Sequence, residues 1–117
     1  MENVILLELF EIDFLPEALE FLNEIPMKAK DKILFNMAMA RSKKDPKLFK
    51  PLQDEIWYFR TQYFGNHYRI FAFWDKSKRK NTLVIATHGI IKKSDKPEES
   101  EILKAKVIKD KYFESKK

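Results

Sequence analysis

Arginine is the residue type in this sequence whose chemistry is easiest to assign. Arg60 and Arg69 lie in two aromatic runs, at positions 56–64 and 67–74, and the pair Gly65-Asn66 separates the runs. That pair suits the positive φ angles of a tight turn, which predicts an antiparallel hairpin. With a two-residue loop at 65–66, Gln62 faces Arg69, and the two arginines are diagonal neighbours on one face, about 7–8 Å apart at the backbone.

Two guanidinium groups held so close on a sheet repel each other unless an anion or an acidic side chain lies between them. Phosphate is a natural anion here, because the planar fork of arginine donates paired hydrogen bonds to phosphate oxygens. The structural alternative is that one arginine pairs with a glutamate of the last predicted helix while the other is solvated. The hairpin therefore predicts a phosphate site, with an ion pair as the alternative.

His88 and the lysines after it form a second group of polar residues. His88 ends a predicted strand, and Lys92, Lys93 and Lys96 follow Gly89. A lone histidine more often satisfies a buried hydrogen bond than performs chemistry, so a structural role stays open. The sequence has two histidines and no cysteine, which leaves too few ligands for a metal site.

Periodicity predicts the elements that hold these residues. Strand patterns cover 3–12, 56–64, 67–74 and 82–88, whereas helical spacing covers 15–25, about 27–43, and 102–112. The connector at 42–51 is basic, and two prolines are expected to keep it irregular. The order β-α-α-β-β-β-α predicts an α+β fold of one domain, residues 1–117, with a mostly antiparallel sheet packed on a helical hairpin and a last helix.

Alternation along the hairpin sorts its side chains into two faces. The arginines share one face with Ile56, Tyr58, Gln62, Phe71 and Phe73. The other face is almost free of charge and is expected to pack on the helical hairpin; it carries Trp57, Phe59, Thr61, Tyr63, Tyr68, Ile70, Ala72 and Trp74. In the second helix, one apolar stripe is expected at Ile33, Leu34, Met37 and Ala38.

The charge of the chain is unevenly distributed. The 117 residues carry a net charge of +5, but residues 1–40 sum to −5, residues 41–80 to +7 and residues 81–117 to +3. A basic C-terminal part suits a polyanion such as nucleic acid, although lysine chosen for solubility would give the same total. No apolar stretch is long enough to span a bilayer and no signal peptide is evident, so a cytoplasmic protein is expected.

Several short motifs occur together between Leu48 and Ala105. They are Phe49-Lys50-Pro51-Leu52, Ile56-Trp57 with Arg60, Tyr68-Arg69-Ile70-Phe71, and His88-Gly89 leading to Lys92-Lys93, Lys96-Pro97 and Glu101-Ile102. In this combination and order the segment resembles the HigB-like branch of the RelE/ParE superfamily of bacterial type II toxins. The N-terminal third has little motif content, but its predicted strand and helical hairpin are what that compact fold requires.

This resemblance implies an mRNA endonuclease that acts on ribosome-bound message without a metal or another cofactor. Its partners would be the ribosome, mRNA and a cognate antitoxin, often a helix-turn-helix protein, through which the complex contacts DNA. By the same resemblance, Arg60 and Arg69 stabilise the reacting phosphate, and His88 is the general acid or base, assisted by Lys92 or Lys93. RNA binding falls to Lys50, Gln62 and Lys96. The alternatives are a ParE-like inhibitor of DNA gyrase and a regulatory member without catalysis.

Overall fold

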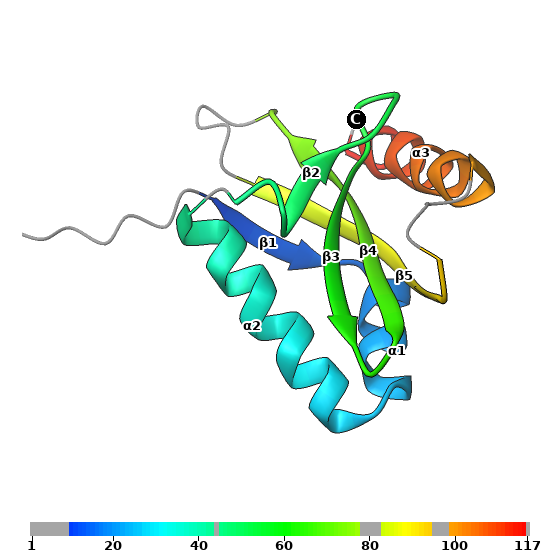
Figure 1. The fold of residues 1–117 in the computed structure, drawn as a ribbon. Coiled ribbons are helices and arrows are strands. Elements are labelled where there is room, and N and C mark those ends of the chain that lie inside the picture. Colours follow the sequence, from blue (N-terminus) through cyan, green and yellow to red (C-terminus); the bar gives the residue numbers. More distant parts are fainter. Residues whose placement is uncertain (1–9, 44, 78–82, 95–98, 117) are drawn as a thin grey trace, which may run out of the picture.

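A five-stranded sheet organises the chain, with helices on both of its faces (Figure 1). The computed structural model describes residues 10–43, 45–77, 83–94 and 99–116. The strands are β1 (Glu11–Phe14), β2 (Phe49–Pro51), β3 (Trp57–Tyr63), β4 (Asn66–Asp75) and β5 (Leu83–Lys92), in the spatial order β1-β5-β4-β3-β2. β1 runs parallel to β5, and the other neighbours are antiparallel. The α+β fold predicted from the sequence is confirmed.

Three helices complete this fold. α1 (Pro16–Glu24) and α2 (Met27–Lys43) cover one face of the sheet, and α3 (Glu99–Glu114) covers the other. Pro16 stands in the first turn of α1, where its missing N–H costs nothing, and Pro26 follows the end of that helix. Among the described residues, no helix is long and apolar enough to cross a membrane.

The two faces of the hairpin are sorted as predicted. Phe59, Tyr68, Ile70 and Ala72 belong to the core beneath α1 and α2, and Tyr58 and Phe71 belong to the core beneath α3. The predicted stripe of α2 is correct in part, because Ile33 and Met37 are buried while Leu34 and Ala38 are exposed. Ala29 and Ala40 complete the buried stripe, which follows the i, i+4, i+8, i+11 spacing of a single helix face.

Two strand predictions need correction. The connector at 42–51 is not wholly irregular, because Phe49–Pro51 forms β2 at the edge of the sheet. The Phe49 ring stacks on Phe59 with centroids 4.1 Å apart. Pro51 has no N–H to donate, and an edge strand tolerates it because the outer side of the strand needs no hydrogen-bond partner. β5 continues beyond His88 to Lys92 by pairing with the start of β4. Most of the predicted strand 3–12 lies outside the described residues, which include Glu11–Phe14 as β1.

The predicted register of the hairpin was also wrong, by two residues. The turn is formed by Phe64 and Gly65, whose φ angles are +48° and +76°, and Tyr63 pairs with Asn66. Arg60 therefore lies directly opposite Arg69. A shift of two residues leaves every side chain on its predicted face. The left-handed conformation of Phe64 costs about 1–2 kcal/mol, which a sequence-based choice of turn would avoid.

Gly89 in β5 is held against the ring of Phe21 in α1. A Cβ atom on Gly89 would overlap Cδ2 of Phe21, so a methyl group there requires the ring to move. We expect Gly89→Ala to lower the free energy of unfolding by about 1–3 kcal/mol, measured by urea denaturation. The double variant Gly89→Ala with Phe21→Leu should recover part of that loss, and an additive double variant would show that the two residues do not clash.

Candidate functional site

The corrected register arranges the predicted site residues in rows across one face of the sheet. Arg60, Arg69 and Ile90 form one row on β3, β4 and β5. Gln62, His67 and Lys92 form the next row, nearer the turn between β3 and β4. On the other side of the arginines lies a third row, which α3 covers and which contains Lys50, Tyr58, Phe71 and His88. Six of the eight predicted residues therefore share this face.

A hollow of about 320 Å³ lies where these rows meet the edge of β3 and the side of α2. We call it the basic hollow, and it is lined by Lys32, Asn36, Lys47, Leu48, Arg60, Thr61, Gln62, His67 and Arg69. β2 pairs with β3 only as far as Phe59, and the preceding loop continues along the edge, where the Leu48 carbonyl oxygen accepts a 2.9 Å hydrogen bond from the Arg60 N–H. No carboxylate is among the residues described as lining it, so the hollow favours an anion.

The two arginines differ in exposure. Arg69 is 1% exposed; its Nη2 donates to the Ser94 carbonyl oxygen at 3.2 Å, and its guanidinium carbon lies 5.7 Å from the Tyr58 ring centroid. Arg60 is half-buried in the same hollow. Two opposed residues of a sheet have Cβ atoms about 4.5–5.5 Å apart, closer than the diagonal arrangement that we predicted. Their side chains therefore start side by side on this face, with Arg69 buried and Arg60 half-buried in the hollow.

The glutamates at the start of α3 have other described contacts. Glu99 accepts a hydrogen bond from Gln53 at 2.6 Å, and Glu101 lies 3.0 Å from Nε2 of His88.

His88 is buried beneath α3 and is not among the residues that line the basic hollow. Its side chain is 1% exposed under α3, where the imidazole stacks on Phe71 and also lies 2.9 Å from Oγ1 of Thr87. Burial lowers the pKa of His88 from its ordinary value, and the positive charge of Lys104 lowers it further, against the opposing effect of Glu101. His88 has these neighbours because β5 continues past it and α3 covers that part of the strand.

Lys50, Lys92 and Lys93 are not among the residues that line the basic hollow. Lys92 is opposite His67 at the end of β5, and Lys93 is exposed just beyond that strand. The Nζ atom of Lys50 lies 6.0 Å from the Tyr58 ring centroid, in the row next to the arginines. Lys96 lies outside the described residues.

A family model describing phage-derived Gp49-like proteins, a domain of unknown function numbered 891, matches residues 20–110. The match covers α2, all of β2 to β5 and most of α3. The chain belongs to the Gp49-like family. This is a family of RelE/HigB-like toxins of toxin–antitoxin systems, so membership implies a cognate antitoxin. No curated protein matches the chain.

The basic hollow of this Gp49-like protein contains three residues that the sequence analysis missed. They are Lys32, on the exposed side of α2, Lys47, within the connector expected to be irregular, and His67, at the start of a predicted strand. Only the correct turn position would have placed His67 opposite Gln62 in the row beside the arginines. Lys32 and Lys47 reach the hollow through tertiary packing, for which the sequence carries no local signal.

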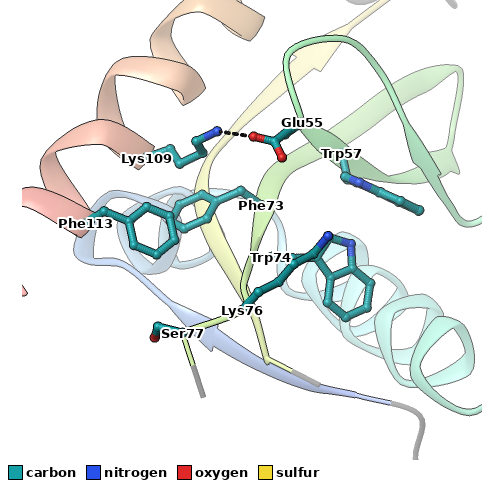
Figure 2. A pocket seen from close by; sticks show the side chains of 8 residues that line it. All are labelled: Glu55, Trp57, Phe73, Trp74, Lys76, Ser77, Lys109 and Phe113. Carbon is teal, nitrogen blue, oxygen red and sulfur yellow. Dashed lines mark hydrogen bonds and ion pairs between the residues drawn. The ribbon is translucent and has the colours of Figure 1, made fainter. Parts of the chain in front are cut away.

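A second hollow, of about 360 Å³, lies at the opposite end of β3 and β4 in this Gp49-like protein (Figure 2). Trp57, Trp74, Phe73 and Phe113 supply its aromatic surface. Figure 2 shows Lys109 directed to Glu55, and their side chains are 3.1 Å apart. None of the predicted site residues lines this hollow. It has two ammonium groups, Lys76 and Lys109, and one carboxylate, Glu55, so it attracts anions less than the basic hollow does.

Proposed function

We propose that this Gp49-like toxin is an mRNA interferase of the HigB-like type, a metal-independent endoribonuclease that cuts ribosome-bound message and so inhibits translation. The observation that carries the proposal is the direct opposition of Arg60 and Arg69 in a basic hollow that His67 also lines. Arginine pairs recognise phosphate, and a histidine can move protons at neutral pH. Family membership supports the toxin part of the proposal.

RNA supplies its own nucleophile for this reaction. The 2′-OH loses its proton to a base and attacks the adjacent phosphorus, forming the O2′–P bond. The P–O5′ bond then breaks, and an acid donates a proton to the departing oxygen. The products are a 2′,3′-cyclic phosphate and a free 5′-hydroxyl, with no change in oxidation state. Arg60 and Arg69 stabilise the additional negative charge on the phosphorane.

The proton-transfer role moves from His88 to His67 in this proposal. His67 lines the hollow with both arginines, whereas the imidazole of His88 is buried against Phe71 and Glu101. A general acid or base must come within hydrogen-bond reach of the proton that it transfers. We therefore assign His88 a positioning role, holding α3 on the sheet, and Lys92 the role of an auxiliary cation beside His67, with Lys93 next to it in sequence.

RNA binding is assigned to the cations around the hollow and to one amide. Lys32, Lys47 and Gln62 line it, and Lys50 lies one row from the arginines. Lysines of this kind contact phosphates and supply affinity without sequence preference. Lys96 is retained as an RNA contact on the resemblance alone. We further propose that the protein is cytoplasmic and consists of one domain. It would bind the ribosome and mRNA directly, and DNA only through a helix-turn-helix antitoxin.

Mapping of message ends tests this proposal. Induction of the intact chain in cells should produce new 5′-hydroxyl ends within coding regions, detected by primer extension. The variant Arg60→Ala should reduce these ends by about 10²–10³-fold, the loss expected when one donor to the reacting oxyanion is removed. Lys111→Ala, which removes one exposed positive charge from α3, should leave them unchanged.

Growth arrest without new message ends would reject the nuclease and favour the ParE-like alternative, inhibition of DNA gyrase. The absence of both arrest and cleavage, in a protein that folds and binds its antitoxin, would favour the regulatory alternative. Equal cleavage by wild type and Arg60→Ala would reject the assignment of the hollow as the active site.

A further inference from the structure

The turn between β3 and β4 presents an aromatic ring to solvent at a conformational cost. Phe64 is 86% exposed and has a φ angle of +48°, a conformation that bulky side chains rarely adopt. Asn, Asp or Gly would form the same turn without strain. The ring lies against Tyr63, with centroids 4.5 Å apart. An exposed, strained phenylalanine at a turn contributes little to the core, so its ring is available for a ligand.

Beneath this turn is a hollow of about 340 Å³, which we call the tip hollow. It lies where the β3–β4 turn comes beside the turn joining α1 to α2 (Figure 1). Its lining is mainly apolar, and Lys28, Asn66 and the hydroxyl groups of the two tyrosines are its hydrogen-bonding groups: Pro26, Met27, Lys28, Tyr63, Phe64, Asn66 and Tyr68. Met27 is 76% exposed, so a second large apolar side chain is open to solvent there. Flat rings, a flexible thioether and a few polar groups suit a planar heteroaromatic ligand.

The tip hollow is close to the basic hollow along the same strand. Gln62 lines the basic hollow, and its neighbour Tyr63, which points to the other face of β3, lines the tip hollow together with Phe64 of the turn. Lys32 joins the two, because it lines the basic hollow while its Nζ lies 5.7 Å from the ring centroid of Tyr63. No carboxylate is among the residues described as lining either one. A positively charged groove next to exposed aromatic rings is typical of proteins that bind single-stranded nucleic acid.

We infer that the tip hollow is a base-binding subsite, in which Phe64 stacks on an unpaired nucleobase of the RNA whose adjacent phosphate occupies the basic hollow. This inference rests on the proposed function and adds to it the requirement for a single-stranded segment. A paired base is stacked inside its helix and cannot present a face to Phe64. Every base has a π-face, so stacking depends little on sequence. The subsite therefore selects an unpaired base and fixes its position, and it discriminates little between the four bases.

Binding of an uncleavable RNA tests the subsite. The probe is a short single-stranded RNA with 2′-O-methyl groups throughout and one 2-aminopurine, whose fluorescence reports stacking. Phe64→Asn removes the ring and suits the turn, and we expect it to weaken binding by about 5- to 150-fold, the range for loss of one base stack. Phe64→Tyr keeps an aromatic ring and should retain most of the affinity. Phe35→Ala is the matched control, since Phe35 is 63% exposed on α2 and lines neither hollow.

Salt dependence separates the two hollows in the same experiment. Phe64→Asn should leave the slope of log affinity against log salt unchanged, whereas Arg60→Ala should reduce it by about one phosphate contact. Unchanged affinity and 2-aminopurine quenching in Phe64→Asn would overturn the subsite, as would failure of the wild type to bind the probe at low salt. Loss of antitoxin binding with RNA binding intact would assign the tip hollow to a protein partner instead. The probe has no 2′-OH, so these results are independent of the message-end test of cleavage.

Discussion

His67→Ala should lower the rate of RNA cleavage by about 10²–10⁴-fold, the usual contribution of a general acid or base. The physical reason is position, because His67 is the histidine that lines the basic hollow with Arg60 and Arg69. The measurement is single-turnover cleavage of ribosome-bound message by purified protein across a range of pH. Loss of one limb of the pH–rate profile would identify proton transfer, whereas a uniform fall at every pH would indicate binding alone.

His88→Ala is the matched comparison for His67→Ala. Removing the buried imidazole deletes its contacts with Glu101, Thr87 and Phe71, so we expect a loss of about 1–3 kcal/mol in unfolding free energy. Cleavage by the fraction that stays folded should fall much less than in His67→Ala. If folded His88→Ala protein loses cleavage while His67→Ala keeps it, His88 is the proton-transfer group, as the resemblance to the HigB-like branch implied.

The pH dependence of stability gives a second comparison. Burial lowers the pKa of His88, so below about pH 6.5 an unfolded histidine takes up a proton that the folded one resists. The unfolded state then binds more protons, and stability falls as pH decreases through this range. His88→Ala should remove this part of the pH dependence, measured by urea denaturation between pH 5 and pH 8.

The sequence was sufficient for the fold class and for the sharing of one face by Arg60 and Arg69. Side-chain alternation has a period of two, so the face assignment remained correct although the pairing of the two strands was wrong by two residues. It was insufficient for the exact pairing of the hairpin, because Phe64 occupies a turn position that local preferences assign to Gly, Asn or Asp. The basic hollow depended on that pairing, since it brings His67 opposite Gln62.

The roles of individual residues were harder to predict than their faces. His88 lies within β5 and not at its end, and its environment is decided by α3, a helix that begins at Glu99 and covers the third row. Lys32 and Lys47 come from α2 and from the loop before β2, which approach the edge of β3 only after folding. Burial and tertiary proximity therefore separate reactive from structural side chains, and neither has a local signature in the chain.

Asp75 at the end of β4 should be among the most sensitive positions for stability. It is completely buried and accepts hydrogen bonds from Tyr112 at 2.6 Å, from Lys116 at 2.8 Å, and from the backbone and hydroxyl of Ser77. Tyr112 and Lys116 belong to the C-terminal end of α3 and the residues after it, so this carboxylate ties that end to the sheet. Asparagine has the same shape, but its amide nitrogen would face donors, and we expect Asp75→Asn to cost about 2–4 kcal/mol.

Acid titration distinguishes a charged contact from packing at Asp75. Burial alone would raise the pKa of Asp75, but the hydrogen bonds from Lys116, Ser77 and Tyr112 together hold it below its ordinary value. The stabilisation is therefore complete above about pH 4 and is lost as pH falls further, because the unfolded carboxylate is protonated first. Asp75→Asn should lack this acid-dependent loss, and Asp110→Asn, an exposed change on α3, should behave as wild type within about 0.5 kcal/mol. Equal acid sensitivity in wild type and Asp75→Asn would mean that packing, and not the carboxylate charge, holds the end of α3.

Cleavage by folded Asp75→Asn should remain close to wild type, since the residue lies at the opposite end of β4 from His67 and Arg69.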